Sequence, residues 1–235
     1  MKREYYLDLA RSGLRMPIGA DLVLHERRDP EAVLEDGARL GAVVAETAER
    51  YHTPLAVPRM DLELEKTALL RAIGVPAAEI PKYHFEKRPP EGAAAAVAAF
   101  LTAKGDSRFR AHVESITWVA ANTRLLPVGM SIGPFSLLTK LLSDPITPIF
   151  LAGSGLSATD DPEVGLLEEV LALAEATVMA SLRVQVSAGA KAVFIAEPAA
   201  NQVYFSPKQI AAGSNIFDRY VMGPNHRLAN FLAAE

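Results

Sequence analysis

The sequence predicts an α/β fold of the TIM-barrel type, with parallel strands and an incomplete barrel. Three short apolar segments, 17–24, 126–132 and 191–198, each precede a loop and a helical pattern, and a weaker strand candidate covers 53–62. This alternation of strand and helix is typical of a parallel sheet. A complete barrel usually takes about 250 residues, whereas roughly four strand–helix units occupy all 235 residues here. We therefore expect one domain over residues 1–235 that forms either an open four-unit sheet or part of a barrel.

Helices are expected between and after these strands. The longest one opens at Asp161-Pro162, because an N-cap side chain followed by proline at the first helical position is typical of a helix start. Its apolar positions also repeat with a helical period. The segment 76–92 is bounded by prolines, and we interpret it as an excursion outside the core. The expected helices cover residues 29–52, 93–104, 135–144, 162–189 and 215–235.

The composition is that of a globular protein: half of the residues are hydrophobic, 22% are charged, and the net charge is −4. No basic patch of the kind that nucleic acid requires is visible, and no apolar stretch is long enough to span a membrane. Residues 1–15 contain two acidic side chains and no apolar core, so we expect no signal peptide. Cysteine is absent, which excludes disulfides and thiolate ligands within this chain. Together these features predict a cytoplasmic protein.

Candidate functional residues follow the expected strands. In parallel strand–helix folds, ligands bind where the carboxyl ends of the strands and their loops converge. The polar residues and glycine selected by this rule are His25 and Glu26 after the first strand, Asp61, Glu63 and Glu65 after the second, Ser131 and Gly133 after the third, and Glu197, Asn201 and Gln202 after the fourth.

Several of these residues admit two interpretations. Asp61, Glu63 and Glu65 alternate with leucines. In an extended segment this period places three carboxylates on one face, where they raise one another's pKa and prepare a general acid. The alternative is a solvent-exposed helix start, because acidic residues favour the first turn. His25 is either an acid, base or ligand, or an exposed loop side chain. Glu197 directly follows the apolar strand AVFIA, which favours a functional role at the barrel mouth over a structural one.

The glycines give little support to a phosphate-binding loop. The GSG stretch at 153–155 lacks the spacing of a P-loop or of a dinucleotide-binding motif. Gly133-Pro134 is better interpreted as a tight turn that brings the backbone close to a ligand. HExxH is absent, so no local motif favours metal-dependent hydrolysis; the GxSxG spacing does occur, as GMSIG at 129–133.

The segments around the third and fourth expected strands resemble the uroporphyrinogen decarboxylase superfamily. Its members carry a G-x-P-[WF]-[TS]-L turn after a strand, then a G-A-D-x-[IV]-x-[ILV]-x-[DE] strand and an [IS]-S-P step into a helix. The matching strings are VGMSIGPFSLLTKLL, AGAKAVFIAEPAANQVYFSPKQI and NIFDRYV, and the opening PIGADLVLHE also fits. PRMDLELEKTALLRAIGVP is similar to the D…EAEALG stretch of the superfamily's corrinoid-dependent methyltransferases. The resemblance covers nearly the whole chain and about the first two thirds of the family's usual length.

The resemblance implies a TIM barrel with one of two chemistries. Decarboxylases hold a tetrapyrrole with an arginine-rich N-terminal loop, an aspartate after the second strand and a tyrosine in the third unit. Here 25-HERRDP-30 replaces that loop, Asp61 matches the aspartate, and Lys140 stands where the tyrosine is expected, which disfavours decarboxylation. The methyltransferases transfer a methyl group between a corrinoid protein and a thiol or methoxy-type substrate, with a zinc held by His and Cys side chains of the C-terminal half. This chain has no cysteine, so it does not form such a zinc site alone.

We therefore expect corrinoid-linked methyl transfer that a further segment or partner chain completes. The expected catalytic residues are Asp61, Glu65 and Glu197, and the expected substrate contacts are His25, Ser131, Phe135, Lys140 and Asn201. One alternative is uroporphyrinogen decarboxylase itself. Another is a non-catalytic half barrel that pairs with itself or with a partner, because open strand edges and an apolar inner face favour association. The expected partners are a small-molecule substrate and a corrinoid protein, and the sequence does not specify the methyl donor or acceptor.

Overall fold

The computed structural model describes residues 4, 11, 20–103 and 105–235, and these form two compact units. The first unit contains residues up to Met60, Asp106–Met130 and Gln185–Phe194. The second contains Asp61–Gly105, Ser131–Val184 and Ile195–Glu235. Each unit is therefore assembled from three separate segments of the chain, and two strands and one helix pass from one unit into the other.

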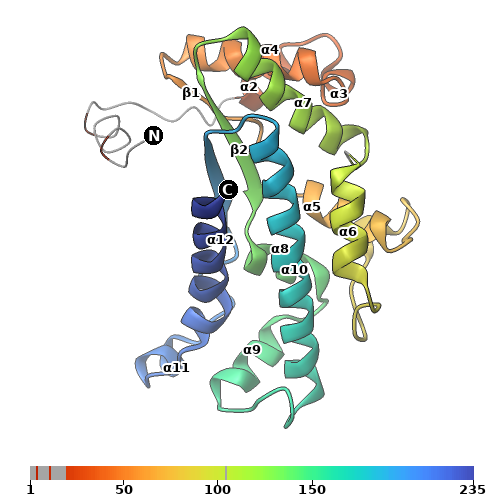
Figure 1. Cartoon of the computed structure of the whole chain (residues 1–235). Coiled ribbons are helices and arrows are strands. Elements are labelled where there is room, and N and C mark those ends of the chain that lie inside the picture. Colours follow the sequence, from red (N-terminus) through yellow and green to blue (C-terminus); the bar gives the residue numbers. More distant parts are fainter. Residues whose placement is uncertain (1–3, 5–10, 12–19, 104) are drawn as a thin grey trace. The chain divides into compact units, whose positions relative to one another are not determined.

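The strands form a three-stranded parallel sheet in the order β1-β2-β3 (Figure 1). The pairing of β1 (Leu55–Ala56) with β2 (Leu126–Ile132) places Leu55 opposite Leu126 and Ala56 opposite Pro127. Next to β2 lies β3 (Ala192–Ala196), with the Lys191 N–H donating to the Pro127 carbonyl at 2.9 Å. β2 matches its predicted bounds, and all seven of its residues are buried.

The first unit also contains α2 (Ala20–His25), α3 (Pro30–Val33), α4 (Gly37–Arg50) and α7 (Ser107–Asn122). α4 and α7 pack along each other. Two glycines one helical turn apart permit this close contact. A Cβ at Gly37 would lie 2.3 Å from the Cβ of Glu114, and one at Gly41 would lie 2.8 Å from the Trp118 ring. The sequence analysis predicted no helix over 107–122.

Gln185, near the end of α10 (Pro162–Ser187), pairs with the backbone of β2 inside the first unit. Its Oε1 accepts a hydrogen bond from the Met130 N–H at 2.7 Å, and its Nε2 donates to the Met130 carbonyl at 2.9 Å. The same Oε1 lies 3.1 Å from Nε2 of His112. A Cβ at Gly129 would lie 2.8 Å from this oxygen, so glycine gives the amide room to reach the strand. The Gln185 side chain thus satisfies the N–H and the carbonyl group of Met130, as the backbone of a neighbouring strand does in a sheet.

Replacing this amide with an apolar side chain tests its contribution to stability. We expect Gln185→Leu to lower the free energy of unfolding by about 3 kcal/mol, because it leaves two buried backbone groups of Met130 without partners. Urea unfolding measures the change. Gln202→Leu, in an exposed loop, is the matched control and should change stability by less than about 0.5 kcal/mol. Equal effects of the two substitutions would contradict a role for Gln185 in completing the strand.

The second unit is mainly helical and contains the carboxyl ends of β2 and β3. The Gly133 N–H donates to the Ala196 carbonyl at 2.7 Å, which joins these two ends. The helices are α5 (Leu64–Ala72), η1 (Ile80–Lys82), α6 (Ala93–Thr102), α8 (Pro134–Leu141), α9 (Ile146–Gly153), most of α10, α11 (Pro207–Ala211), the π-helical η2 (Asp218–Met222) and α12 (Gly223–Ala234).

Three expectations about secondary structure need correction. The segment 17–24 was expected to be a strand, but Ala20–His25 is helix α2, and 17–19 lie outside the described residues. Val23 and Leu24 are buried whereas Leu22 is 62% exposed, so one face of a helix contacts the core. The sequence did not distinguish this helix from a strand buried on both faces, because so short an apolar run fits either. The strand expected over 53–62 is only two residues long. The helix expected over 29–52 is divided into α3 and α4 at Asp36, whose side chain caps α4 by accepting from the Arg39 N–H.

The fold is therefore α/β with parallel strands, as predicted, but the described residues contain three strands where four strand–helix units were expected. Over the described part of the chain, no helix combines the length and the apolar character needed to cross a membrane.

Candidate functional site

The predicted site residues that follow β1, β2 and β3 all belong to the second unit. They form two local groups in the described structure. One surrounds the carboxyl group of Glu65, and the other surrounds that of Glu197.

Glu65 lies in the first turn of α5 and is 1% exposed. Its Oε1 accepts hydrogen bonds from the hydroxyl groups of Ser131, at the end of β2, and Ser181, in α10, both at 2.8 Å. Its Oε2 is buried and has no hydrogen-bond partner among the residues that the structure describes. The structure thus brings together two predicted site residues, Glu65 and Ser131, and adds Ser181, which no motif in the sequence marks.

Burial raises the pKa of Glu65 to about 7, because a carboxylate loses its hydration in this environment. The hydrogen bonds from Ser181 and Ser131 favour the charged form and lower the pKa, but burial has the larger effect. A carboxyl group in this state can hold or release a proton close to neutral pH. The cause of the raised pKa is burial, and not the cluster of carboxylates that the alternation predicted.

Glu197 directly follows β3, and its carboxylate lies at the N-terminus of α8. It accepts hydrogen bonds from the N–H groups of Phe135 at 3.1 Å and Ser136 at 2.7 Å. The side chain of Asn225, in α12, donates to Oε1 at 3.2 Å. A Cβ at Gly133 would lie 2.1 Å from the carboxyl carbon of Glu197, so only glycine permits this approach. The carboxylate serves as a cap for the first turn of α8.

An aromatic cluster lies beside the first turn of α8. Phe135 is fully buried, and its ring centroid lies 4.9 Å from that of Phe205 and 5.9 Å from that of Tyr204. Phe205 also contacts Phe217 with a centroid distance of 5.4 Å. These separations and the edge-on contacts are typical of stabilising aromatic pairs. Phe135 therefore packs in the core behind Glu197.

The alternation predicted that the three acidic residues after β1 would share one face of an extended segment. They do not share one face. Helix α5 begins at Leu64, so Glu65 turns into the core whereas Glu63 stays exposed and forms an ion pair with Lys140. Asp61 accepts a hydrogen bond from the Glu63 N–H at 3.2 Å at the helix start. The alternative interpretation, an acidic helix start, is confirmed for Asp61 and Glu63 but is wrong for Glu65, which is buried.

Lys66 is a buried cation beside this ion pair that the sequence analysis did not select. It is 4% exposed, and its Nζ donates to the Pro81 carbonyl at 3.4 Å. Burial lowers the pKa of Lys66, while nearby Glu63 raises it and Lys140 lowers it further. Lys66 of α5 and Lys140 of α8 thus both lie close enough to Glu63 to feel its charge, and Lys140 forms the ion pair with it.

Asn201 is an exposed loop residue and not part of either group. Its Nδ2 donates to the Pro198 carbonyl at 2.8 Å, and its Oδ1 accepts from the Val203 N–H at 2.8 Å. Both bonds are local, as in a turn that an asparagine side chain stabilises.

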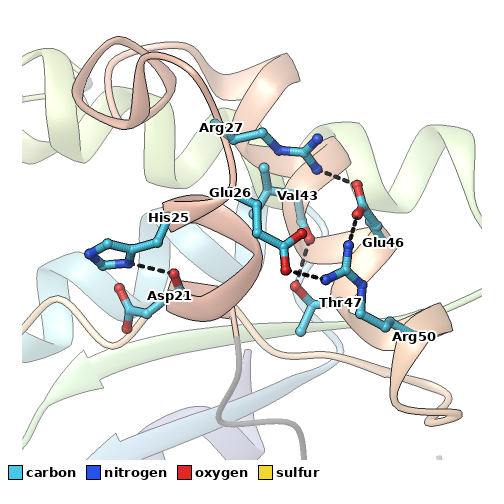
Figure 2. Close-up of polar contacts among 8 residues, drawn as sticks. All are labelled: Asp21, His25, Glu26, Arg27, Val43, Glu46, Thr47 and Arg50. Carbon is cyan, nitrogen blue, oxygen red and sulfur yellow. Dashed lines mark hydrogen bonds and ion pairs between the residues drawn. The ribbon is translucent and has the colours of Figure 1, made fainter.

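His25 belongs to the first unit and ends α2. Its Nδ1 lies 2.7 Å from the Asp21 carbonyl, and the side chain is exposed (Figure 2). The neighbouring residues of 25-HERRDP-30 are also engaged locally. Arg27 pairs with Glu46, and Arg50 joins Glu46 to Glu26 with a 2.6 Å contact to the latter (Figure 2). The hydrogen bonds from Arg27 and Arg50 lower the pKa values of Glu46 and Glu26, respectively.

No protein-family model matches this sequence, and no curated protein sequence matches it either. Among solved structures, a methyltransferase from Methanosarcina mazei is similar to this chain. The TM-score is 0.60 and 17% of aligned residues are identical, over 92% of this chain and 59% of that protein. The chain thus has the fold of part of a methyltransferase. It spans less than two thirds of that protein's length, and at this identity the likeness concerns the fold alone.

The residues that sequence reasoning missed come from helices distant along the chain. Ser181 lies 116 positions from its partner Glu65, and Asn225 lies 28 positions from Glu197. Ser181 is a polar residue in an otherwise apolar stretch of α10, which is a local signal, whereas Asn225 is followed by His226 and Arg227 and has no such signal. A polar residue in an apolar stretch indicates a buried hydrogen bond but does not identify the partner.

Proposed function

We propose that this chain takes part in corrinoid-linked methyl transfer, completed by a further segment or by a partner chain. The observation that supports the proposal is the fold likeness to a methyltransferase over 92% of the chain. The strand-end carboxyl groups add to it, because catalytic groups in parallel strand–helix folds lie at the carboxyl ends of the strands. Glu197 directly follows β3, and Glu65, in the first turn of α5, accepts a hydrogen bond from Ser131 at the end of β2.

In this proposal the strand ends form the surface that holds the small methyl-bearing or methyl-accepting molecule. Glu65, with its pKa near 7, is the group suited to exchanging a proton with a leaving or attacking atom, through the hydroxyl of Ser131. Glu197 orients the first turn of α8, and Asp61 and Lys140 supply charges at the exposed start of α5. His25 and Asn201 remain proposed substrate contacts.

The described residues do not fit the zinc that the resemblance implies. The chain has no cysteine, and no group of three or more His, Asp or Glu side chains in the described ranges is placed to hold a metal ion. Activation of a thiol by zinc is therefore not assigned to these residues. The corrinoid is treated as a substrate that a separate corrinoid protein presents.

Ligand binding tests this proposal directly. We expect the purified chain to bind methylcob(III)alamin with a dissociation constant in the micromolar range, roughly 8 kcal/mol of binding free energy, measured by equilibrium dialysis. Uroporphyrin III at the same concentration is the competing probe, read from its Soret band. Binding of the porphyrin without the corrinoid would replace methyl transfer with the decarboxylase alternative, and binding of neither would contradict both.

The half-barrel alternative is favoured by one specific observation. Ile146 and Phe150 on α9 and Ile210 on α11 are exposed apolar side chains. The two helices are joined by Gln209, whose Nε2 donates to the Phe150 carbonyl at 2.8 Å. Exposed apolar groups on linked helices favour association, here with a second copy of the chain. Light scattering after size-exclusion chromatography distinguishes a monomer from a dimer.

A further inference from the structure

The Pro-bounded segment 76–92 forms one wall of a cleft of about 680 Å³ in the second unit. Ser143, just after α8, lines the cleft from another part of the chain. A second hollow of about 310 Å³ shares the residues Glu86, Lys87 and Arg88 with it. Clefts of roughly 300–1,000 Å³ are the usual size of small-molecule sites.

The segment is fixed at both ends, although it contains little regular structure. Ile80 and Phe85 are buried, and the Phe85 N–H donates to the Leu141 carbonyl at 2.8 Å. The Tyr83 ring meets the Phe85 ring edge-on at a centroid distance of 5.3 Å. Arg88 pairs with Glu169 of α10 at 3.1 Å. These contacts fix the backbone that carries the polar side chains between the anchors.

Two lysines, Lys82 and Lys87, line the cleft on either side of Phe85, and both are exposed. Neither forms an ion pair or a side-chain hydrogen bond with the other residues that the structure describes. His84 and Tyr83 line the same cleft and offer a ring nitrogen and a hydroxyl group. Two ammonium groups without an ion-pair partner among the described residues, beside a ring nitrogen and a hydroxyl group, suit an oxyanion with more than one negative charge, because lysine binds phosphate as a point charge.

Two carboxylates, Glu79 and Glu86, also line the cleft. They repel a bare phosphate ion, but they accept hydrogen bonds from the hydroxyl or amino groups of a larger ligand. The exposed part of the Tyr83 ring offers a surface for the ligand's sugar or base. The mixture of charges thus favours an ester over an inorganic anion.

We propose that this cleft binds a phosphate ester with a polyhydroxylated organic part, a sugar phosphate or a nucleoside monophosphate. Lys82 and Lys87 hold the phosphate, and Glu79 and Glu86 face the hydroxyl groups of the organic part. The site is independent of the strand-end carboxyl groups described above.

Isothermal titration calorimetry at low ionic strength, with ribose 5-phosphate, AMP and inorganic phosphate as probes, tests the proposal. We expect at least one ester to bind about tenfold or more tightly than inorganic phosphate. The double variant Lys82→Gln/Lys87→Gln should weaken ester binding by about 100-fold, roughly tenfold for each lost charged contact. Lys208→Gln, the same substitution at one exposed lysine on α11, is the control and should leave binding unchanged within about twofold.

Thermal melting followed by circular dichroism checks that both variants remain folded, which is expected because the substituted side chains are exposed. Tighter binding of AMP than of ribose 5-phosphate supports contact between the base and Tyr83, and the reverse order supports a sugar phosphate. Absence of ester binding, binding of the double variant equal to that of the parent, or equal affinity for inorganic phosphate would each overturn the proposal.

Discussion

The stability of the chain should fall as the pH rises through the range in which Glu65 titrates. The pKa of an ordinary glutamate is 4.5, and burial raises that of Glu65 to about 7. Between these values the folded state binds more protons than the unfolded state, so unfolding becomes easier with rising pH. Below about pH 4.5 both states are protonated and the effect is absent, and above about pH 7 it is complete. The difference between the two pKa values corresponds to roughly 3 kcal/mol.

Glu65→Gln separates this contribution from those of all other groups. The amide has the shape of the acid but does not ionise, so its stability relative to the parent should improve by roughly 3 kcal/mol between pH 4.5 and pH 8. Urea unfolding at several pH values measures the difference. Glu91→Gln makes the same chemical change at an exposed turn and should alter stability by less than about 0.5 kcal/mol. A difference between parent and Glu65→Gln that does not vary with pH would contradict the raised pKa.

The pH dependence of stability also bears on function, because a buried carboxyl group whose Oε2 has no hydrogen-bond partner among the described residues lowers stability. In enzymes, such a cost is often retained where the protonated group is used. A large pH-dependent penalty at Glu65, combined with binding of methylcob(III)alamin, would favour a proton-transfer role for this residue. The same penalty without ligand binding would favour a purely structural role.

The central strand and the strand ends could be predicted because their signals are local. Apolar runs bounded by loops identified β2 and β3, and the rule that ligands bind at carboxyl ends selected Ser131 and Glu197. Residues 61–65 were harder, since a two-residue alternation over five positions fits both a strand and the first turn of a helix. Because the segment is helical from Leu64 onward, the side chain of Glu65 points away from that of Glu63 and is buried.

The hydrogen-bond partners of these residues could not be predicted, because they lie far away along the chain. The hydrogen bond from Ser181 to Glu65 joins residues that are 116 positions apart in the sequence, and the bond from Ser131 to Glu65 joins residues that are 66 positions apart. Which helix approaches which strand end depends on the packing of the whole unit. A glycine in or next to a buried strand indicates the close approach of another group. At Gly129 this signal was missed, and the group is Gln185; at Gly133 the close approach of a ligand was predicted, and the group is the side chain of Glu197.

The capping of α8 by Glu197 predicts a strong coupling between Glu197 and Gly133. Gly133→Ala should lower the free energy of unfolding by about 3 kcal/mol, because its Cβ would lie 2.1 Å from the Glu197 carboxyl carbon. Backbone strain does not contribute, since the dihedral angles of Gly133, φ −78° and ψ 159°, are open to any residue. Glu197→Ala should cost about 2 kcal/mol, through loss of the charged hydrogen bonds to the first turn of α8.

A double-mutant cycle tests whether these two effects share one cause. When Glu197→Ala removes the carboxyl group, the space for a Cβ at Gly133 becomes free, and the second substitution should then cost less than about 1 kcal/mol. The coupling energy should therefore be about 2 kcal/mol. Gly165→Ala, where a Cβ would lie 3.4 Å from the nearest atom, is the control in helix α10 and should be neutral or stabilising by up to about 1 kcal/mol. Simple additivity of Gly133→Ala and Glu197→Ala would mean that Glu197 does not occupy the N-terminus of α8, and its carboxylate would then be free for a ligand.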